Sequence, residues 1–456
     1  MAKQFAVKPR KVPAVETGFR KICTEIPVPD SLPFLEELRK YEPLSMTGQP
    51  PIVWDRAEGF QVHDKWGNTW LDWSSGVLVA SAGHSRPEIR EAVLEAVNKP
   101  LLHNYCFPND YRGRLAHRIV ELAPEGIDKC FLLTTGSEAV ECIIKISRAN
   151  GQKVGGPEKN IVVTFNGDFH GRTMASQLAG GSPALKEWIG PTMDTGFVQV
   201  DLPGNIRTAD SSFDAFLKAL EARGATAGKI CLVLPETYQG GSCAFLPREF
   251  AGKLREWCTA NRIVLGFDEV QAGFGRCGTL WGFEHYGITP DIFCMGKGIS
   301  SSLPISAVAG KGELMDLFGP NSMTSTHTGN PLSCAAALAN IEVILGLLEA
   351  ARARGEQLHA GLGAVKDRFP KNIAAVQGRG MVAGVHFVRP GSELEPDGET
   401  AFDIVERCVE KGLLMFAPVG AGSATVKIAP PLSTSQEALA EELAVFEEAT
   451  AEIVGS

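Results

Sequence analysis

The chain has 456 residues, of which 44% are hydrophobic and 21% are charged, which is typical of a globular protein with two or three domains. Its net charge of −9 at pH 7 argues against a nucleic-acid or anionic-membrane partner, because either would require a basic surface. Eleven cysteines without a CxxC pair predict reduced thiols in a cytoplasmic protein. No apolar run of membrane-spanning length and no secretory signal are recognised, so no membrane partner is expected.

Residues 1–75 are predicted to form an N-terminal arm and part of a small domain. The first 50 residues are rich in proline and charge, with one short helix expected near residues 31–40. Alternating apolar and polar residues from Ile52 to Trp73 predict a β-hairpin or small meander. A helix is expected at residues 87–98.

The central part of the chain alternates short apolar runs with helix-like segments, which is typical of βαβ units and a mainly parallel sheet. We therefore predict an α/β fold with a large domain at residues 76–331, helices on both faces of the sheet, and a ligand at the carboxyl ends of the strands. The predicted strands are residues 130–133, 161–165, 230–234, 263–267 and 292–295, and the predicted helices are residues 139–149, 213–222 and 247–261.

The C-terminal part, residues 332–456, is predicted to complete the small domain, which would then be assembled from both chain ends. A long helix rich in alanine and leucine should run from Pro331 to about Arg354. The further predicted strands are residues 373–378, 382–388, 413–416 and 425–428, and the closing helices are residues 399–411 and 436–453.

An aspartate and a lysine stand at the ends of two successive predicted strands. Asp268 follows the strand at 263–267, and Lys297 lies between two glycines after the strand at 292–295. Pyridoxal 5'-phosphate (PLP) chemistry needs such a pair: the lysine holds the cofactor as a Schiff base, and the carboxylate keeps the pyridine nitrogen protonated. Each residue alone is more often a solvated surface group, so the other motifs must decide.

Two further segments follow predicted strands. In residues 134–139, Gly136 permits close backbone approach and Ser137 is a natural N-cap, so the segment predicts an anion site, although an ordinary helix cap is the simpler interpretation. In residues 168–173, Phe169 could stack on a planar ring and Arg172 could bind an anionic group. Its simpler interpretation is a core aromatic beside a surface arginine.

Three other motifs are set aside. Residues 273–278 match GxGxxG, but a loop rich in glycine and proline follows where a dinucleotide fingerprint opens a helix. The Gly296-Lys297-Gly298 segment lacks the upstream glycine and the following Ser or Thr of a phosphate loop. The nine histidines show no HxxxH or HxH spacing, so no catalytic metal is expected.

Taken together, the segments resemble one family, the class III (fold type I, ω-amino acid type) PLP-dependent aminotransferases. They occur in the family's order and cover most of the chain from Ile52 onward. The resemblance implies a large domain with a sheet of the seven-stranded type and a smaller α/β domain. The matching segments are TGSEAVE at 135–141, FHGRT at 169–173, ETYQGG at 236–241, FDEVQAGFGR at 267–276, PD at 290–291, GKG at 296–298, THTGNP at 326–331, GRGM at 378–381 and IAPPL at 428–432.

The resemblance also implies roles around the cofactor ring. Lys297 would bind the cofactor covalently and shuttle a proton, and Asp268 would pair with the pyridine nitrogen. Val270 would pack on one face of the ring and Phe169 would stack on the other. Gln271 would approach the phenolic oxygen of the ring.

Further implied roles concern the phosphate and the assembly. Gly136 and Ser137 would hold the phosphate, and Thr326 would be supplied by a neighbouring subunit, because the family builds its site at a homodimer interface. Trp73 would line the substrate entrance, with an ordinary core aromatic as the equal alternative.

The sequence departs from the family in the segments that contact substrate. Glu236-Thr237-Tyr238-Gln239 replaces the usual Glu-Pro-Val-Gln, and Lys427 stands where some members have an arginine that binds the acceptor's carboxylate. A keto acid acceptor other than 2-oxoglutarate, such as pyruvate, is therefore equally plausible. Arg172 is the best candidate for binding a carboxylate, sulfonate or phosphonate tail on the amino donor.

The prediction is an aminotransferase that moves an amino group from a primary, expected terminal, amine with an acidic tail to a keto acid by a ping-pong mechanism. A lyase, decarboxylase or mutase of the same fold remains as an alternative. A nicotinamide oxidoreductase and a non-catalytic binding protein are the further rivals, and an intact Lys297 and Asp268 argue against the last.

Overall fold

The computed structural model describes residues 3–190 and 196–455, and the chain divides into two compact units. The first unit contains Met1–Arg86 and Glu349–Ser456, and the second contains Pro87–Leu348. The second unit corresponds to the predicted large domain at 76–331. Its later C-terminal boundary falls within one long helix, α10 (Pro331–Arg368), which continues beyond the predicted end at Arg354.

The second unit is built on a seven-stranded sheet in the order β6-β12-β11-β10-β9-β7-β8. All neighbouring strands pair in parallel except β12, which is antiparallel to both β6 and β11. The sheet thus confirms the predicted mainly parallel architecture. The strands are β6 (Lys129–Leu133), β7 (Ile161–Phe165), β8 (Phe197–Val200), β9 (Ile230–Val233), β10 (Val264–Asp268), β11 (Ile292–Met295) and β12 (Ser306–Gly310).

Two of these strands, β8 and β12, were not predicted from the sequence. The β12 sequence is Ser-Ala-Val-Ala-Gly, whose small residues have low strand propensity, yet every one of its residues is buried. Its strand conformation is therefore imposed by pairing on both sides. The β8 strand, Phe-Val-Gln-Val, is as short as β9 and β11, but its apolar run is interrupted by Gln199 and most of it is only partly buried.

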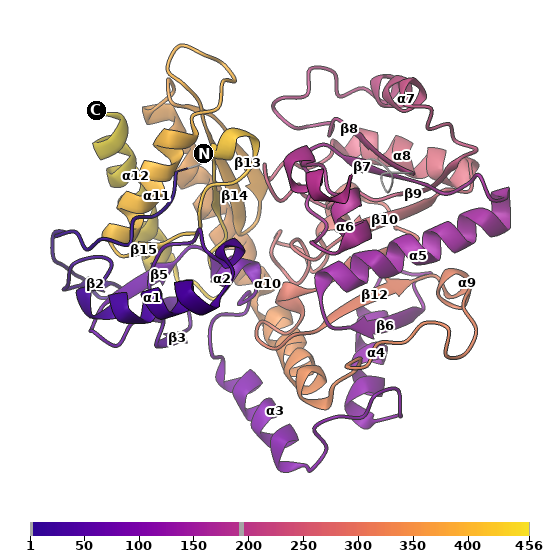
Figure 1. Ribbon diagram of the computed structural model, residues 1–456, viewed down its shortest axis with the longest axis horizontal. Coiled ribbons are helices and arrows are strands. Elements are labelled where there is room, and N and C mark those ends of the chain that lie inside the picture. The colour runs from indigo at the N-terminus through magenta and orange to yellow at the C-terminus, as the bar shows by residue number, and fades with distance from the viewer. Residues whose placement is uncertain (1–2, 191–195, 456) are drawn as a thin grey trace. The chain divides into compact units, whose positions relative to one another are not determined.

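Helices cover the sheet because each carries an apolar stripe at helical spacing. In α5, the buried residues Ala139, Val140, Ile143 and Ile146 pack against buried strand residues of the sheet. Figure 1 shows α5 running across the sheet, with α7 and α8 near β8 and β9. The helices are α3 (Pro87–Asn98), α4 (Asp110–Leu122), α5 (Gly136–Gly155), α6 (Met174–Ala179), α7 (Phe213–Ala222), α8 (Arg248–Ala260) and α9 (Gly312–Met315).

The first unit combines segments from both chain ends, as predicted. Its six-stranded sheet pairs β15 from the C-terminal segment in parallel with β5 from the N-terminal segment, and a separate three-stranded sheet has the order β13-β14-β16. The strands are β1 (Val15–Glu16), β2 (Lys21–Ile22), β3 (Arg56–Glu58), β4 (Gln61–His63), β5 (Thr69–Asp72), β13 (Ile373–Arg379), β14 (Val382–Phe387), β15 (Leu413–Leu414) and β16 (Thr425–Ile428). The helices are α1 (Leu32–Tyr41), α2 (Ser75–Leu78), α11 (Gly398–Glu410) and α12 (Gln436–Val454).

Helix α10 is long and apolar enough, by length and composition, to cross a membrane. Its most apolar 18-residue window has a mean hydropathy of 1.8, and 50% of that window is buried inside the fold. This differs from the prediction that no apolar run reaches such a length. A core helix of a folded protein passes the same test, so the finding is weak evidence for a membrane segment.

A buried carboxyl group lies in the core of the first unit. The side chain of Glu442 on α12 is fully buried, and neither of its oxygens has a hydrogen-bond partner of normal geometry among the described residues. Burial raises the pKa of Glu442 well above its usual value; the Trp73 side chain opposes this shift, and the charges of Asp72 and Glu441 add to it. The folded state therefore favours the neutral form of this group more than the unfolded chain does.

Replacing Glu442 by glutamine is expected to raise the melting temperature at about pH 8, by an amount equivalent to about 1 kcal/mol. The folded pKa lies above the unfolded one. Below the unfolded pKa, the ionisation of Glu442 therefore does not lower the free energy of unfolding. As the pH rises from the unfolded pKa toward the folded pKa, it lowers the free energy of unfolding progressively. Thermal denaturation at about pH 5 and about pH 8 would measure the effect. Glu437→Gln, an exposed position on the same helix, is the control. An equal gain from both variants would contradict the prediction.

Candidate functional site

The carboxyl ends of four strands in the second unit, β6, β7, β10 and β11, border one pocket. It offers about 490 Å³ of space, open solvent included. Because β6, β7, β9, β10 and β11 all run in the same direction, the residues that follow them meet at one edge of the sheet. The pocket is lined by Thr135, Gly136, Ser137, Phe169, His170, Gly171, Asp268, Val270, Gln271 and Lys297. Seven of these are sequence-predicted site residues.

Lys297 begins the short 3-10 helix η6 (Lys297–Ile299) directly after β11. Its backbone has a φ of 43°, a left-handed conformation that costs energy in any residue other than glycine. Burial lowers the pKa of Lys297, while the nearby charges of Asp268 and Glu236 oppose this shift. A lowered pKa favours the neutral amine, which is the form that attacks a carbonyl carbon.

Asp268, the last residue of β10, is held in place by two groups. Its Oδ1 accepts a hydrogen bond from the backbone N–H of Val270 at 2.9 Å, and its Oδ2 lies 2.8 Å from His170 Nδ1. The other ring nitrogen of His170, Nε2, lies 3.4 Å from Asp168 Oδ2. Burial lowers the pKa of His170, but the two aspartates outweigh it and raise the pKa to about 10.

Glu236, which follows β9, positions residues of the pocket. Its Oε2 accepts hydrogen bonds from the backbone N–H groups of Phe169 at 2.9 Å and Gly240 at 3.0 Å, and its Oε1 accepts one from Gln271 Nε2 at 2.9 Å. Burial, reinforced by the charges of Asp168 and Asp268, raises the pKa of Glu236 to about 8. Its predicted substrate role stays a prediction.

An anion site forms where β6 meets α5. Thr135 caps the helix, and its side chain and that of Glu138 close a reciprocal capping box. The first-turn N–H groups of α5 have no carbonyl partner within the helix and carry its positive dipole end. Ser137 Oγ accepts a hydrogen bond from the backbone N–H of Arg172 at 3.2 Å. Gly136 and Ser137 thus lie in the first turn of a helix whose N-terminus could bind an anion, and their predicted phosphate role stays a prediction.

The absence of a side chain at Gly136 keeps the pocket open beside Val270. A Cβ built there would lie 2.9 Å from Val270 Cγ1, closer than real contacts allow. Phe169 lines the same pocket, and the exposed guanidinium of Arg172 lies over its ring, 5.5 Å from the centroid. Arg172 is therefore next to a residue that lines the pocket, and its predicted role in binding a substrate tail stays a prediction.

Five predicted site residues are not among those that line the pocket. Glu236 accepts hydrogen bonds from two residues that do, and the Arg172 guanidinium lies over the Phe169 ring. Thr326 is exposed and is not among the residues that line the pocket. Trp73 and Lys427 belong to the first unit. Trp73 is fully buried there and packs against Phe446, with ring centroids 5.5 Å apart, as the core-aromatic alternative expects. Lys427 is buried in β16, opposite Gly384 of β14. Their predicted substrate roles stay predictions.

Sequence analysis assigned no role to His170. The residue lies between Phe169 and Gly171 in a segment that was recognised, but its partner Asp268 is 98 positions away in the chain. Only the fold brings the ring between two carboxylates. The available signal was the acidic residue two positions before the histidine, which by itself is too common to indicate an interaction.

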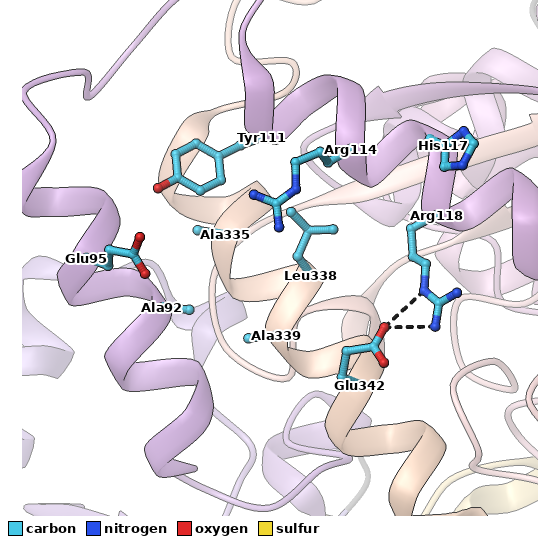
Figure 2. A pocket seen from close by; sticks show the side chains of 10 residues that line it. All are labelled: Ala92, Glu95, Tyr111, Arg114, His117, Arg118, Ala335, Leu338, Ala339 and Glu342. Carbon is cyan, nitrogen blue, oxygen red and sulfur yellow. Dashed lines mark hydrogen bonds and ion pairs between the residues drawn. The ribbon is translucent and has the colours of Figure 1, made fainter.

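A larger pocket elsewhere in the second unit contains none of the predicted site residues. It offers about 1060 Å³, open solvent included, and lies among α3, α4 and the beginning of α10 (Figure 2). Arg118 is paired there with Glu342 at 2.9 Å. Because it lacks the lysine, the partner aspartate and the helix N-terminus, we place the chemistry in the strand-end pocket.

The GxGxxG segment at residues 273–278 does not open a helix of the dinucleotide-binding kind. It forms turns that lead to η5 (Gly282–Tyr286), a short 3-10 helix. Arg276 of this segment is fully buried. The strand-end pocket, in contrast, fits PLP: a partly buried lysine, a carboxylate at a strand end, an aromatic and a valine side chain, and a glycine-opened anion site all border it.

Comparison with known proteins agrees with this geometry. Residues 45–450 match the family described as Aminotransferase class-III. The acetylornithine aminotransferase of Nostoc sp. is 33% identical over 93% of this chain and 95% of its own length, and the 5-aminovalerate aminotransferase DavT of Pseudomonas putida is 33% identical over 88% and 94%. The ornithine aminotransferase of Toxoplasma gondii, crystallised with PLP partially occupying its active site, superposes with a TM-score of 0.81, 26% identity, and coverage of 92% and 94%.

Replacing Gly136 by alanine is expected to weaken PLP binding about tenfold or more, because the added methyl group would press against Val270 beside the anion site. The dissociation constant can be measured by absorbance titration of the cofactor-free protein. Because the three atoms nearest to the added methyl group all belong to Val270, the Gly136→Ala/Val270→Ala double variant should lose less than the sum of the two single losses. Additive losses would show that contact with Val270 is not the cause.

Proposed function

The chain belongs to the class III aminotransferases, and we propose that it transfers the amino group of a primary amine with an acidic tail to a keto acid, acting as a homodimer. The observation that carries this proposal is the meeting of Lys297, Asp268 and the N-terminus of α5 in one pocket, with Arg172 beside it. Its matched family and relatives are aminotransferases, which disfavours the lyase, decarboxylase or mutase alternative.

When bound, PLP supplies an electron sink that stabilises negative charge at the carbon bearing the amino group. The protein's residues supply the rest. The Lys297 amine provides the covalent attachment point and, once released, moves a proton to and from the substrate carbon. Asp268 holds the proton on the ring nitrogen. The first turn of α5 binds the phosphate, and Gln271, oriented by Glu236, presents its amide to the pocket.

The donor class follows from Arg172 and from the relatives. One relative is named for 5-aminovalerate, a terminal amine that carries a carboxylate at its other end. In this chain the Arg172 guanidinium lies over the Phe169 ring at the side of the pocket, where it can bind such a tail by two parallel hydrogen bonds. We propose that a carboxylate, sulfonate or phosphonate occupies this position.

The homodimer proposal is supported by an exposed surface around Thr326. The segment that contains Thr326 contacts residues 102–105 through two hydrogen bonds, from Asn330 Nδ2 to the carbonyl oxygen of Leu102 and from Tyr105 Oη to Thr324 Oγ1. Leu102 is 59% exposed and Phe107 is 73% exposed. Such apolar side chains beside a predicted phosphate ligand fit a surface that a second subunit covers, so that each subunit would supply Thr326 to the other's site.

We also propose a cytoplasmic location without membrane attachment. The cysteines of the described residues are all free thiols and most are buried, as expected for a reducing compartment. Half of the most apolar window of α10 is buried within the fold, which fits a core helix.

Donor recognition can be tested by adding amines to the cofactor-loaded enzyme without any keto acid. The absorbance of the bound cofactor should change with ω-amino carboxylates, aminosulfonates or aminophosphonates, and should return only after a keto acid is added. Arg172→Gln should raise the half-saturating concentration of acidic donors about tenfold or more, but leave that of neutral amines nearly unchanged.

Arg148→Gln is a matched control for this test. Arg148 also lies over a phenylalanine, 4.8 Å from the centroid of the Phe197 ring, but it follows Gly136 by twelve residues in α5, which is about three helical turns from the pocket. It should leave both classes of donor unaffected. Equal effects of Arg172→Gln on acidic and neutral amines would remove Arg172 from tail recognition, and spontaneous return of the absorbance with release of ammonia or carbon dioxide would support the lyase or decarboxylase alternative.

The shared site can be tested with hybrid dimers. Lys297→Ala should abolish turnover, and Thr326→Ala should weaken cofactor binding and turnover. Because Lys297 acts in its own subunit and Thr326 in the neighbour's, mixing the two variants under subunit exchange should regenerate one intact site per hybrid dimer. Activity should rise to about one quarter of the wild-type value with random pairing. No rise above the sum of the unmixed variants, although hybrids form, would show that Thr326 does not act across subunits.

A further inference from the structure

The ring of His170 lies between two carboxylates: Nδ1 is within hydrogen-bond distance of Asp268, whereas Nε2 lies at ion-pair distance from Asp168 and has no hydrogen-bond partner of normal geometry among the described residues. Nδ1 is 2.8 Å from Asp268 Oδ2, and Nε2 is 3.4 Å from Asp168 Oδ2. Both carboxylates and the imidazole are buried. An ionised carboxylate can only accept hydrogen bonds, and a neutral imidazole carries a proton on only one of its nitrogens. A neutral ring would therefore turn a lone pair toward one of the two carboxylates.

Asp168 is held in place by hydrogen bonds that it accepts. Its Oδ1 accepts from Gln239 Nε2 at 3.0 Å, and its Oδ2 accepts from the backbone N–H of Phe165 at 3.1 Å. Gln239 is held in turn, because its Oε1 accepts from Asn205 Nδ2 at 2.9 Å and from Ser242 Oγ at 2.8 Å. The Asp168 side chain therefore cannot easily turn away from His170.

The other titratable groups near this ring come from the ends of the neighbouring strands. They are Asp268 after β10, Glu236 after β9 and Lys297 after β11. Burial and the two aspartates raise the pKa of Glu236, so this group contributes little negative charge at neutral pH. Asp168 is thus the carboxylate that faces His170 from the side opposite to Asp268.

We propose that Asp168 is a positioning residue that keeps His170 doubly protonated, so that Asp268 faces an imidazolium on one side and the cofactor's ring nitrogen on the other. A cation beside Asp268 favours its ionised form and makes it a weaker base. The proton shared with the cofactor then stays on the ring nitrogen, as the electron sink requires. The inference rests on Asp268 pairing with that nitrogen, but its first test does not require cofactor or turnover.

The protonation state of His170 can be read directly by NMR on the full-length, cofactor-free protein labelled with ¹³C at the histidine Cε1 atoms. His170→Gln identifies the signal. In the wild type it should keep its imidazolium position through about pH 8 and titrate near the pKa of about 10 that its surroundings produce. In Asp168→Asn, which removes the charge with little change of shape, the titration should move down by about 1 to 3 pH units.

Two further variants separate this role from a structural one. Asp168→Glu, which keeps the charge, should restore the titration toward the wild-type pH. Asp291→Asn removes another buried carboxylate of the same unit, one that is paired with Arg255 and Lys311, and should lower stability without moving the His170 signal. In the cofactor-loaded enzyme, Asp168→Asn should change the pH dependence of the bound cofactor's absorbance and lower kcat, with little effect on donor KM.

A wild-type His170 signal that titrates below about pH 7 would overturn the proposal without any variant. So would an unchanged titration in Asp168→Asn. If the NMR titration behaves as expected but the loaded enzyme shows no transamination, the protonation of His170 stands and the proposed substrates fail instead.

Discussion

The parallel pairing of β10 with β11 is the constraint on which the site depends. It places Asp268 opposite Cys294, so that Lys297, three residues farther along, leaves the sheet at the same edge. β9 and β7 continue the sheet in the same direction and bring Glu236 and His170 to that edge. β6 runs in this direction too, because β12 is antiparallel to both β6 and β11, and it delivers the N-terminus of α5. Because these strands run in the same direction, a lysine, three carboxyl groups, an imidazole and a helix N-terminus lie at one edge of the sheet.

Because many ionisable groups lie at one buried edge, the charge of each group shifts the pKa values of its neighbours. His170 gains positive charge between Asp168 and Asp268, Lys297 loses some of its basicity through burial, and Glu236 is pushed toward its neutral form. The shifts have a common cause, since each buried charge is expensive unless an opposite charge lies beside it. An amine of lowered basicity near the carboxyl group of Asp268 is the combination that PLP chemistry requires. The mutual compensation of these buried charges thus also produces the protonation tendencies that the proposed reaction needs.

The sequence predicted those features that are encoded locally. The strands β7, β9, β10 and β11 have apolar runs, and the residues after them carry Phe169, Asp268 and Lys297, so the sheet edge could be anticipated. The sequence could not predict β12, because its small residues form a strand only when they pair with β6 and β11 on either side. Nor could it predict that His170 meets Asp268 across 98 positions, or that Glu236 bonds to the backbone of Phe169 across 67. Long-range polar contacts carry no periodic signal, so they are visible only in the fold.

The same distinction explains why the reaction can be assigned more firmly than the substrate. The proposed reaction depends on groups whose surroundings are fixed within one unit: hydrogen bonds restrain Asp268 and Glu236, and Gly136 lies close against Val270. The proposed substrate choice and assembly depend instead on exposed groups, of which Arg172 and Thr326 are the leading examples. Exposed side chains can be changed at little cost to stability. A chain can therefore keep the chemistry of Lys297 and Asp268 while the groups around the entrance adapt to a different amine.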